Sequence, residues 1–358
     1  MAKSRRLKIA ISLNGEGRGH LTRVSALARR LEKRHILGFW CPPTIRKELS
    51  AAFPNSMIRP IPGLRFVMKG AEVDYIATAA ANLPGILSAG AAVSALAGDL
   101  AEFRADGVLS DFEPYLPEAA VRLGLPILQL NHPGIVTRMG GGEPEAHLAR
   151  LVASRMMGRF DRLVLSSFYE GDVGPIIRPE ILRTRRHAQH GNYVVVYAKD
   201  EFRERFRDTL DRMPGIRFRY FPDPTQDFPS ALAGCRAVIA PSGHQMASEA
   251  LCLRKPIFAV PISGQYEQRL NGQMLKASGR GDWAPQDSFE EPVRRFLREL
   301  NSYPRAPDPR YRFRFKDDGA RAARLVETFF RKPPSSPEAR RVYTRVTWPL
   351  GRLAPKAL

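Results

Sequence analysis

The stretch 240–281 combines small, acidic and amide residues in a pattern that could bind an anion. It reads as a strand end, a short turn of Ser242 and Gly243, and the opening of a helix. The first N–H groups of a helix have no partner within it, and together with the helix dipole they attract anions. Glycine leaves the backbone open to a ligand because it has no side chain. The turn therefore predicts an anion site.

Three polar side chains near this turn could bind hydroxyl groups. Glu249 lies about two turns into the helix, too far from its start to cap it. A carboxylate at that depth can accept hydrogen bonds from two adjacent hydroxyls, as a ribose offers. Glu267 and Gln268 are neighbours in the next loop and suit the hydroxyls of a sugar. With the anion site, these residues suggest a nucleotide-sugar ligand.

A second candidate loop, residues 14–20, reads NGEGRGH and follows the first predicted strand. Its glycines at Gly15, Gly17 and Gly19 let the backbone approach a phosphate or a sugar. The spacing is not the GxGxxG of dinucleotide-binding enzymes, and no acidic residue ends the second predicted strand. The absence of GK[ST] excludes a P-loop.

His20 ends this loop, near the start of a helix, and is the candidate general base. Asp111 ends the fourth predicted strand and would hold the imidazole in one tautomer, because ends of parallel strands can be neighbours. The alternatives are that His20 and Asp111 each cap a helix. His132 and Glu16 are the reserve candidates for this pair.

These loops follow strands in a chain where strand-like and helix-like runs alternate throughout, which indicates βαβ units and parallel sheets. Strands are predicted at 7–13, 35–40, 107–110, 126–130 and 162–166, and again at 193–198, 216–220, 237–240 and 257–260. Helices are predicted at 22–32, 84–103, 116–123, 201–212, 245–253, 270–277, 292–300 and 318–330.

The predicted fold class is α/β, with two doubly wound, Rossmann-like domains facing a cleft. A chain of 358 residues is long for one core, and 171–191 lacks a clear period and suits a linker. A ligand would then bind at the carboxyl ends of the strands. We expect an N-terminal acceptor-side domain at 1–185, a C-terminal nucleotide-sugar domain at 186–310, a helix at 311–331 and a basic tail at 332–358.

Composition describes a globular protein, with 44% hydrophobic and 26% charged residues. The three cysteines are widely spaced and suit the reducing cytoplasm better than a disulfide framework or structural zinc. The N-terminus reads as a first strand and not as a signal peptide. Residues 75–98 carry no charge but are rich in Ala, Gly and Ser, so we expect a buried helix and no membrane span.

The net charge of +20 raises the question of an anionic partner. No nucleic-acid motif accompanies the basic residues, so we expect no nucleic acid. The excess is either solvated surface or a means of settling on the anionic inner face of the membrane. The stretch after Phe330 has seven Arg or Lys against Glu338 alone, with Trp348 and Leu350, and suits either a membrane contact or a disordered tail.

Five motifs are similar to those of the GT-B glycosyltransferases, over roughly the first 330 residues. They read GEGRGHLTR (15–23), LSDFEP (109–114), SGHQMASEAL (242–251), KPIFAVPI (255–262) and GQYEQRLN (264–271). The chain most resembles the branch related to the peptidoglycan N-acetylglucosaminyltransferase, the diacylglycerol glycosyltransferases and the UDP-glycosyltransferases.

The resemblance implies a metal-independent, inverting transfer of a sugar from a nucleoside diphosphate, UDP in particular, to an acceptor hydroxyl. No further cofactor is implied, and the acceptor is a glycan, a lipid or a small molecule. Carried over by position, His20 would be the base, with Asp111 behind it. The diphosphate would be bound by Ser242, Gly243, His244 and Gln245, and Gly17 and Gly19 would also lie at the donor. Glu249 would bind the ribose, and the sugar would be bound by Glu267 and Gln268.

Two departures leave the branch open. Plant and animal relatives carry a histidine where this chain has Pro241, so His244 would have to supply that phosphate contact. The sequence LNHPG around His132 also differs from the usual amide-containing one, which affects the acceptor side. The alternatives are a nucleotide-sugar 2-epimerase and a catalytically inactive nucleotide-sugar-binding protein. The donor sugar and the oligomeric state stay open.

Overall fold

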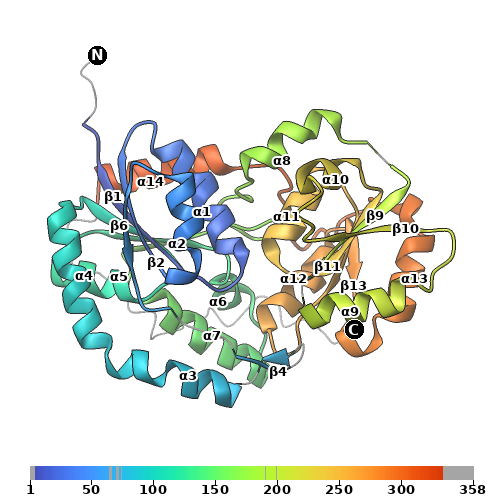
Figure 1. The fold of residues 1–358 in the computed structure, drawn as a ribbon, viewed down its shortest axis with the longest axis horizontal. Helices are drawn as coiled ribbons and strands as arrows, with labels where there is room; N and C mark the ends of the chain where they lie inside the picture. Colours follow the sequence, from blue (N-terminus) through green and yellow to red (C-terminus); the bar gives the residue numbers. More distant parts are fainter. Residues whose placement is uncertain are drawn as a thin grey trace.

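The computed structural model describes residues 5–63, 67–69, 72–73, 75–189, 191–198 and 200–333. The predicted basic tail lies outside these residues from position 334 on. Two parallel sheets, one in each half of the chain, stand side by side with helices around them (Figure 1). This confirms the predicted α/β architecture.

The N-terminal sheet has six parallel strands in the order β3-β2-β1-β6-β7-β8. Their bounds are β1 Lys8–Leu13, β2 Ile36–Cys41, β3 Met57–Pro60, β6 Gly107–Asp111, β7 Ile127–Asn131 and β8 Arg162–Leu165. A separate antiparallel pair is formed by β4 Met68–Lys69 and β5 Glu72–Val73. β1 pairs with β6 so that Leu13 lies opposite Asp111. The loop after β1 and the end of β6 therefore reach the same edge of the sheet.

Both faces of this sheet are covered, which explains why its strands are almost entirely apolar. Ile9 and Ile11 pack into a core with α1 and α2, while Ala10 points to the other face with α4 and α5. The helices are α1 Arg18–Leu31, α2 Pro43–Ala52, α3 Tyr75–Leu87, α4 Ala89–Phe103, α5 Tyr115–Arg122, α6 Ile135–Met139 and α7 Pro144–Met157.

Two helices differ from the prediction in ways that matter. α1 begins at Arg18, four residues before the predicted start, so His20 lies in its first turn. The uncharged stretch 75–98 contains a break at Ser88 and forms parts of α3 and α4. Among the described residues, no helix has both the length and the apolarity needed to cross a bilayer.

The C-terminal sheet has five parallel strands in the order β10-β9-β11-β12-β13. They are β9 Tyr193–Tyr197, β10 Arg217–Phe221, β11 Ala237–Pro241, β12 Ile257–Val260 and β13 Gly281–Trp283, of which β13 was not predicted. The surrounding helices are α8 Pro179–Thr184, α9 Asp200–Leu210, α10 Phe228–Gly234, α11 His244–Cys252, α12 Tyr266–Ala277 and α13 Glu290–Arg298, with short 3₁₀ turns at Arg185–His187, Gln286–Ser288 and Leu300–Ser302.

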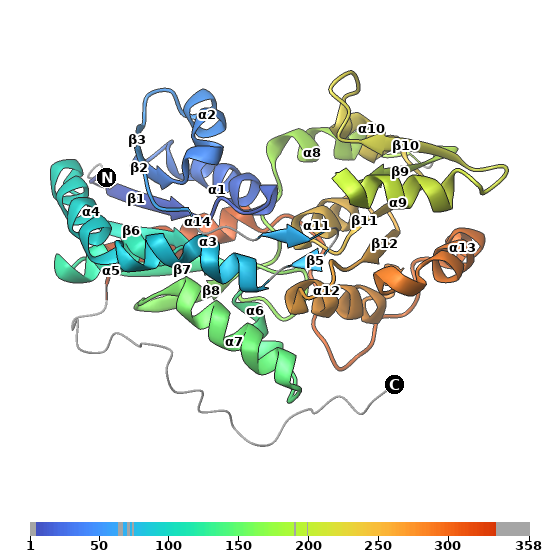
Figure 2. The same cartoon turned by 60° about the horizontal axis from the view of Figure 1, so that its bottom comes forward.

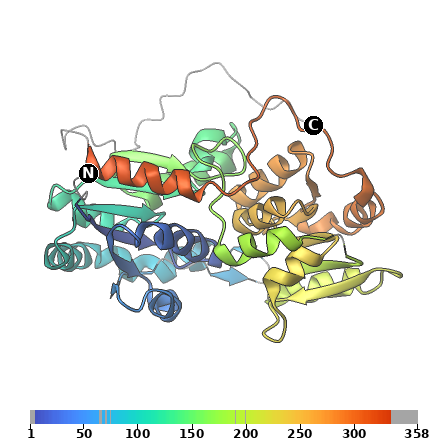
Figure 3. The same cartoon turned by 90° about the horizontal axis from the view of Figure 1, so that it is seen from above.

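The last helix, α14 Gly319–Arg331, packs against the N-terminal domain (Figure 3). Its buried residues Val326 and Phe330 join the core around α1, and Phe330 leaves no room for a Cβ at Gly107. The chain thus crosses twice between the domains, once before α8 and once before α14. The amphipathic pattern predicts this helix, but only its packing shows which domain it completes.

Candidate active site

Two helices from different domains bring their N-terminal ends together at the domain boundary. A Cβ placed on Gly19, in the first turn of α1, would lie 3.6 Å from Cβ of Gln245 in the first turn of α11 (Figure 1). The preceding loop needs glycine at Gly17, where φ is 69°, a region that other residues rarely adopt. Both helix starts carry positive dipole ends, so the boundary attracts negative charge.

At the end of β6, Asp111 binds two side chains of α1. Nδ1 of His20 lies 2.8 Å from Oδ1 of Asp111, and Arg23 reaches both carboxylate oxygens at 2.7 and 2.9 Å. Burial alone would raise the pKa of Asp111, but Arg23 and His20 outweigh it and hold that pKa below its ordinary value. An ionised carboxylate only accepts hydrogen bonds, so Nδ1 of His20 is the donor, and in the neutral ring Nε2 is then the atom with the lone pair. That tautomer suits a base.

Phe112 also helps to position this group. Its φ of 59° is unusual for a bulky residue and indicates local strain. The ring lies 6.0 Å from the His20 ring, nearly parallel at 14°. The strained turn after β6 thus places an aromatic face beside the imidazole.

The start of α11 contains buried polar atoms that have no hydrogen-bond partner among the described residues. In the part of the chain that the structure describes, Oγ of Ser242 and Nδ1 of His244 have no hydrogen-bond partner. Nε2 of His244 accepts from the backbone N–H of Phe168 at 3.2 Å, so Nδ1 carries the proton. Gly243 has an ordinary extended conformation, and a Cβ there would meet nothing within 4 Å. The turn therefore offers two donors beside open space.

The imidazole rings of His132 and His244 stack across the boundary, with centroids 3.6 Å apart. Burial lowers the pKa of His132 to about 3 and lowers that of His244 well below its ordinary value. Both rings are therefore neutral at neutral pH. His132 is only 1% exposed, so this reserve candidate is poorly placed to reach an acceptor.

Asn271 connects the residues around these rings. Its Oδ1 lies 2.9 Å from Nε2 of His132 and accepts from the Tyr169 hydroxyl at 2.8 Å. Its Nδ2 donates to the carbonyl oxygen of Ser242 at 3.0 Å and to Glu267 at 3.3 Å. The sequence analysis missed Asn271, although it follows Glu267 by one helical turn on the same face.

Glu249 is 2% exposed and already has two partners. Arg178 donates to it at 2.9 Å and the Gln245 amide at 3.1 Å. Burial raises the pKa of Glu249, and Arg178 and Gln245 oppose that effect. Arg178 lies in the crossing segment, where no local pattern could have identified it. Ribose hydroxyls would have to replace one of these partners.

Of the two predicted sugar-binding residues, only Glu267 faces the other site residues. Oε1 of Glu267 lies 3.5 Å from Nε2 of His132. Both residues lie in the first turn of α12 and not in a loop as predicted. Gln268 binds the loop before this helix, because its carbonyl oxygen accepts from the Ile262 N–H at 3.0 Å and its amide donates to Gln265 at 2.6 Å. A ligand would have to compete with that loop for Gln268.

Direct contacts cross the boundary around His244 and Asn271, and a large cavity lies elsewhere. Tyr169, Phe168 and His132 from the N-terminal side pack around His244 and Asn271 from the C-terminal side. A cavity of about 1480 Å³ lies beside the amino-terminal edge of the C-terminal sheet and the segment that leads into α14.

Comparison with known proteins agrees with the two-domain fold. Residues 7–301 match the family described as glycosyl transferase family 1. No curated protein sequence matches the chain.

Among solved structures, the glycotransferase of kitacinnamycin is similar at 16% identity, with a TM-score of 0.61, covering 91% of this chain and 99% of that one. MurG of Acinetobacter baumannii is similar at 14% identity, with a TM-score of 0.60, covering 90% and 99%. LpCGTa, solved in complex with UDP, is similar at 15% identity, with a TM-score of 0.57, covering 90% and 94%. At these identities the likeness concerns the fold. With a family match over most of its length and two Rossmann-like domains arranged as in GT-B proteins, the chain belongs to glycosyl transferase family 1.

Proposed function

We propose that this glycosyltransferase moves a sugar from a nucleoside diphosphate, UDP in particular, to an acceptor hydroxyl with inversion and without a metal. The observation that carries the proposal is the 2.8 Å contact between His20 and Asp111 in the first turn of α1, beside the start of α11. A base and an anion site are thereby brought to one place from two domains.

In the proposed reaction, Nε2 of His20 takes the proton of the acceptor hydroxyl. The hydroxyl oxygen then bonds to the anomeric carbon from the side opposite the diphosphate, and the bond from that carbon to the diphosphate oxygen breaks. Asp111 stabilises the imidazolium that forms. One displacement of this kind inverts the anomeric centre.

The leaving diphosphate gains negative charge, and the start of α11 can stabilise it. The helix N-terminus supplies backbone N–H groups, and the Ser242 hydroxyl and the Nδ1–H of His244 have no partner among the described residues. Such donors act strongly in a site that excludes water. We assign the ribose to Glu249, with its hydroxyls taking the place of Arg178 or Gln245.

A lipid-linked acceptor on an anionic membrane is the favoured acceptor class. α7 exposes Leu148, Leu151 and Val152, which are 51%, 55% and 40% exposed, and Arg155 lies one turn further along the same face. Both views place α7 on the same side of the N-terminal domain as α3 (Figure 1, Figure 2). Apolar and basic side chains on one helix face, in a chain of net charge +20, suit the surface of an anionic bilayer.

The test is a donor and acceptor screen with the purified protein. UDP-, GDP- and dTDP-sugars are first ranked by their effect on thermal unfolding, since a bound ligand stabilises the folded state. The best donor is then incubated with and without acceptors, and products are resolved by mass spectrometry. Transfer that depends on acceptor and on His20 is expected. Conversion of the sugar nucleotide to an epimer without acceptor, or binding of the donor without any turnover, would contradict the proposal.

A further inference from the structure

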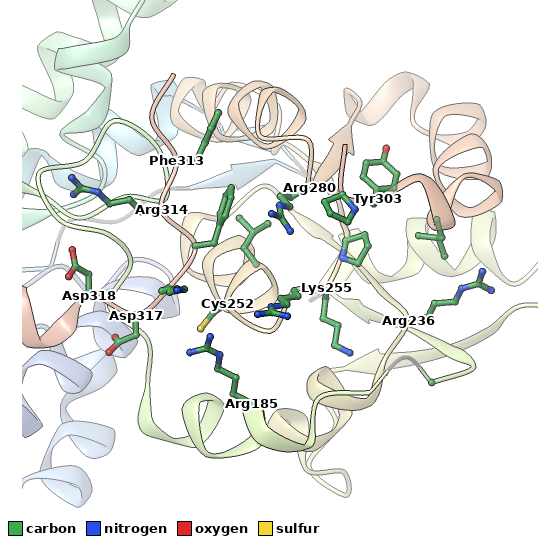
Figure 4. A pocket seen from close by; sticks show the side chains of 18 of the residues that line it. Arg185, Arg236, Cys252, Lys255, Arg280, Tyr303, Phe313, Arg314, Asp317 and Asp318 are labelled. Atoms are coloured by element: carbon green, nitrogen blue, oxygen red, sulfur yellow. The ribbon is translucent and has the colours of Figure 1, made fainter. Parts of the chain in front are cut away.

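The cavity of about 1480 Å³ lies at the amino-terminal edge of the C-terminal sheet (Figure 4). Its lining includes Asn192, Arg236, Pro256 and Arg280, each directly before one of the strands β9, β11, β12 and β13. The returning segment 300–321 contributes the facing wall. The proposed donor site is at the carboxyl ends of the same strands, so the cavity is a separate place.

Positive charge dominates this cavity. Of its two acidic lining residues, Asp317 is paired with Arg30 at 2.8 Å and Asp318 with Arg321 at 3.7 Å. Among the described residues, five basic side chains of the lining have no carboxylate partner. They are Arg185, Arg236, Arg254, Arg280 and Lys316.

Four basic residues of the lining also make local contacts. Nη2 of Arg236 donates to Oδ1 of Asn301 at 3.2 Å, and the Arg280 guanidinium lies 5.0 Å from the centroid of the Phe315 ring. Nζ of Lys255 donates to the carbonyl oxygens of Cys235, at 2.9 Å, and Gln189. Arg314 donates to the carbonyl oxygen of Asp172 at 2.9 Å. Lys255 and Arg314 are thus held to the backbone, and the five side chains without a carboxylate partner supply the remaining positive charge of the cavity.

Helix ends account for part of this charge but not for all of it. Arg236, Arg254 and Arg280 follow the C-termini of α10, α11 and α12, where a cation complements the dipole. Arg254, however, has a φ of 60°, at a position after a helix where glycine is the usual residue. Lys316 comes from the returning segment and caps no helix. Cations gathered around one hollow repel one another, and a bound anion would relieve that repulsion.

We propose that this cavity binds a phosphate-bearing anion at a second site, distinct from the donor site. Arg185 and Arg280 line the hollow from two different elements, while Arg236 lies further along the edge and donates to Asn301 at 3.2 Å (Figure 4). A guanidinium matches two phosphate oxygens at once, so arginines around an open cavity suit a group with several phosphate oxygens. The same chemistry is offered by a soluble diphosphate and by the headgroup of an anionic phospholipid.

The first arm of the test uses inorganic pyrophosphate, titrated calorimetrically into the full chain with excess UDP present to fill the donor site. The variants are Arg254→Gly and Arg280→Gln, with Arg212→Gln, an exposed arginine of another surface, as the control. Arg254→Gly removes the charge and also places glycine at a φ of 60°, a conformation that suits glycine, so this variant is expected to fold. Each cavity substitution should weaken binding about tenfold, because one charge-assisted contact is lost.

The second arm measures flotation with vesicles of phosphatidylglycerol and of phosphatidylcholine. A loss of phosphatidylglycerol binding in the Arg254→Gly and Arg280→Gln variants, without pyrophosphate binding in the parent, assigns the site to the lipid headgroup. Loss of pyrophosphate binding assigns it to a soluble anion. If neither ligand distinguishes these variants from Arg212→Gln, the proposed site does not exist.

Discussion

His132 and His244 stack at 3.6 Å and join an N-terminal strand end to the first residue of α11. The contact excludes a state in which both rings are charged, since two imidazolium ions at that distance would repel each other, and burial lowers the pKa of each ring. It lies directly behind the turn that we assign to the diphosphate. The packing of the two domains and the proposed donor site therefore share a residue.

This pair predicts a loss of stability in mild acid. The pKa of His132 is lowered to about 3, so the unfolded state takes up its proton near the ordinary pKa while the folded state does not. The stabilisation is complete above about pH 6.5 and falls as the pH falls, by about 2 kcal/mol for one histidine at pH 5. Urea unfolding of the parent and His132→Asn at pH 7 and pH 5 measures it.

Glu113 has the opposite pH dependence and needs a control. Burial raises its pKa to about 7, so its contribution favours the folded state at lower pH and is lost as the pH rises above 4.5. The parent and His132→Asn should therefore also be compared in a Glu113→Gln background. An equal pH slope in the parent and in His132→Asn would refute the neutral-pair interpretation.

Replacing His20 with alanine should lower kcat by about 10²–10⁴ and leave donor affinity nearly unchanged, because a general base acts in the transition state. His147→Ala, an exposed histidine on α7, is the matched control with a water-soluble acceptor. Initial rates and UDP titration separate the two effects. A change in donor affinity alone would argue against a base.

Removing Arg23 should destabilise the protein. Asp111 is 2% exposed, and Arg23→Met would leave it charged with only His20 as a partner. Breaking a buried pair on one side costs about 3–5 kcal/mol. The double variant Arg23→Met with Asp111→Asn should regain part of this loss. Chemical denaturation of the parent, both single variants and the double variant gives the free energy of unfolding of each, and from these the coupling energy between Arg23 and Asp111. If the two single losses simply add up in the double variant, the two residues are not paired.

Replacing Glu249 with alanine should weaken UDP binding by about 2–3 kcal/mol if its carboxylate binds two ribose hydroxyls. Glu180→Ala, a partly buried carboxylate of α8 near Arg178, serves as the control. Isothermal titration with UDP compares them. Unchanged affinity in Glu249→Ala would mean that Arg178 keeps the carboxylate when the donor binds.

The exposed face of α7 should contribute to membrane attachment. Leu151→Gln with Val152→Gln removes apolar side chains that are exposed, so folding should be unaffected while association with anionic liposomes falls several-fold. Co-sedimentation is compared with that of Leu123→Gln, an exposed leucine after α5. Equal recovery of both variants would mean that the exposed face of α7 does not contact the membrane.

The sequence alone was enough for the fold class and for the position of the candidate loops. Apolar strands of about five residues alternate with amphipathic helices, and that local periodicity does not depend on distant contacts. Since ligand loops of a parallel sheet follow the strands, the glycine loop before His20 and the turn before His244 could be located in advance. Asp111 could be added because parallel strands end at one edge.

Tertiary structure alone decided which side chains share their hydrogen bonds. Arg23 and Asn271 stand one turn from predicted residues, yet only packing shows that they bind Asp111 and His132. Arg178 reaches Glu249 across the crossing segment, and α14 returns to the first domain. The basic cavity likewise combines loops that are far apart in sequence. Local patterns report the burial of one element, whereas such pairings depend on how whole domains meet.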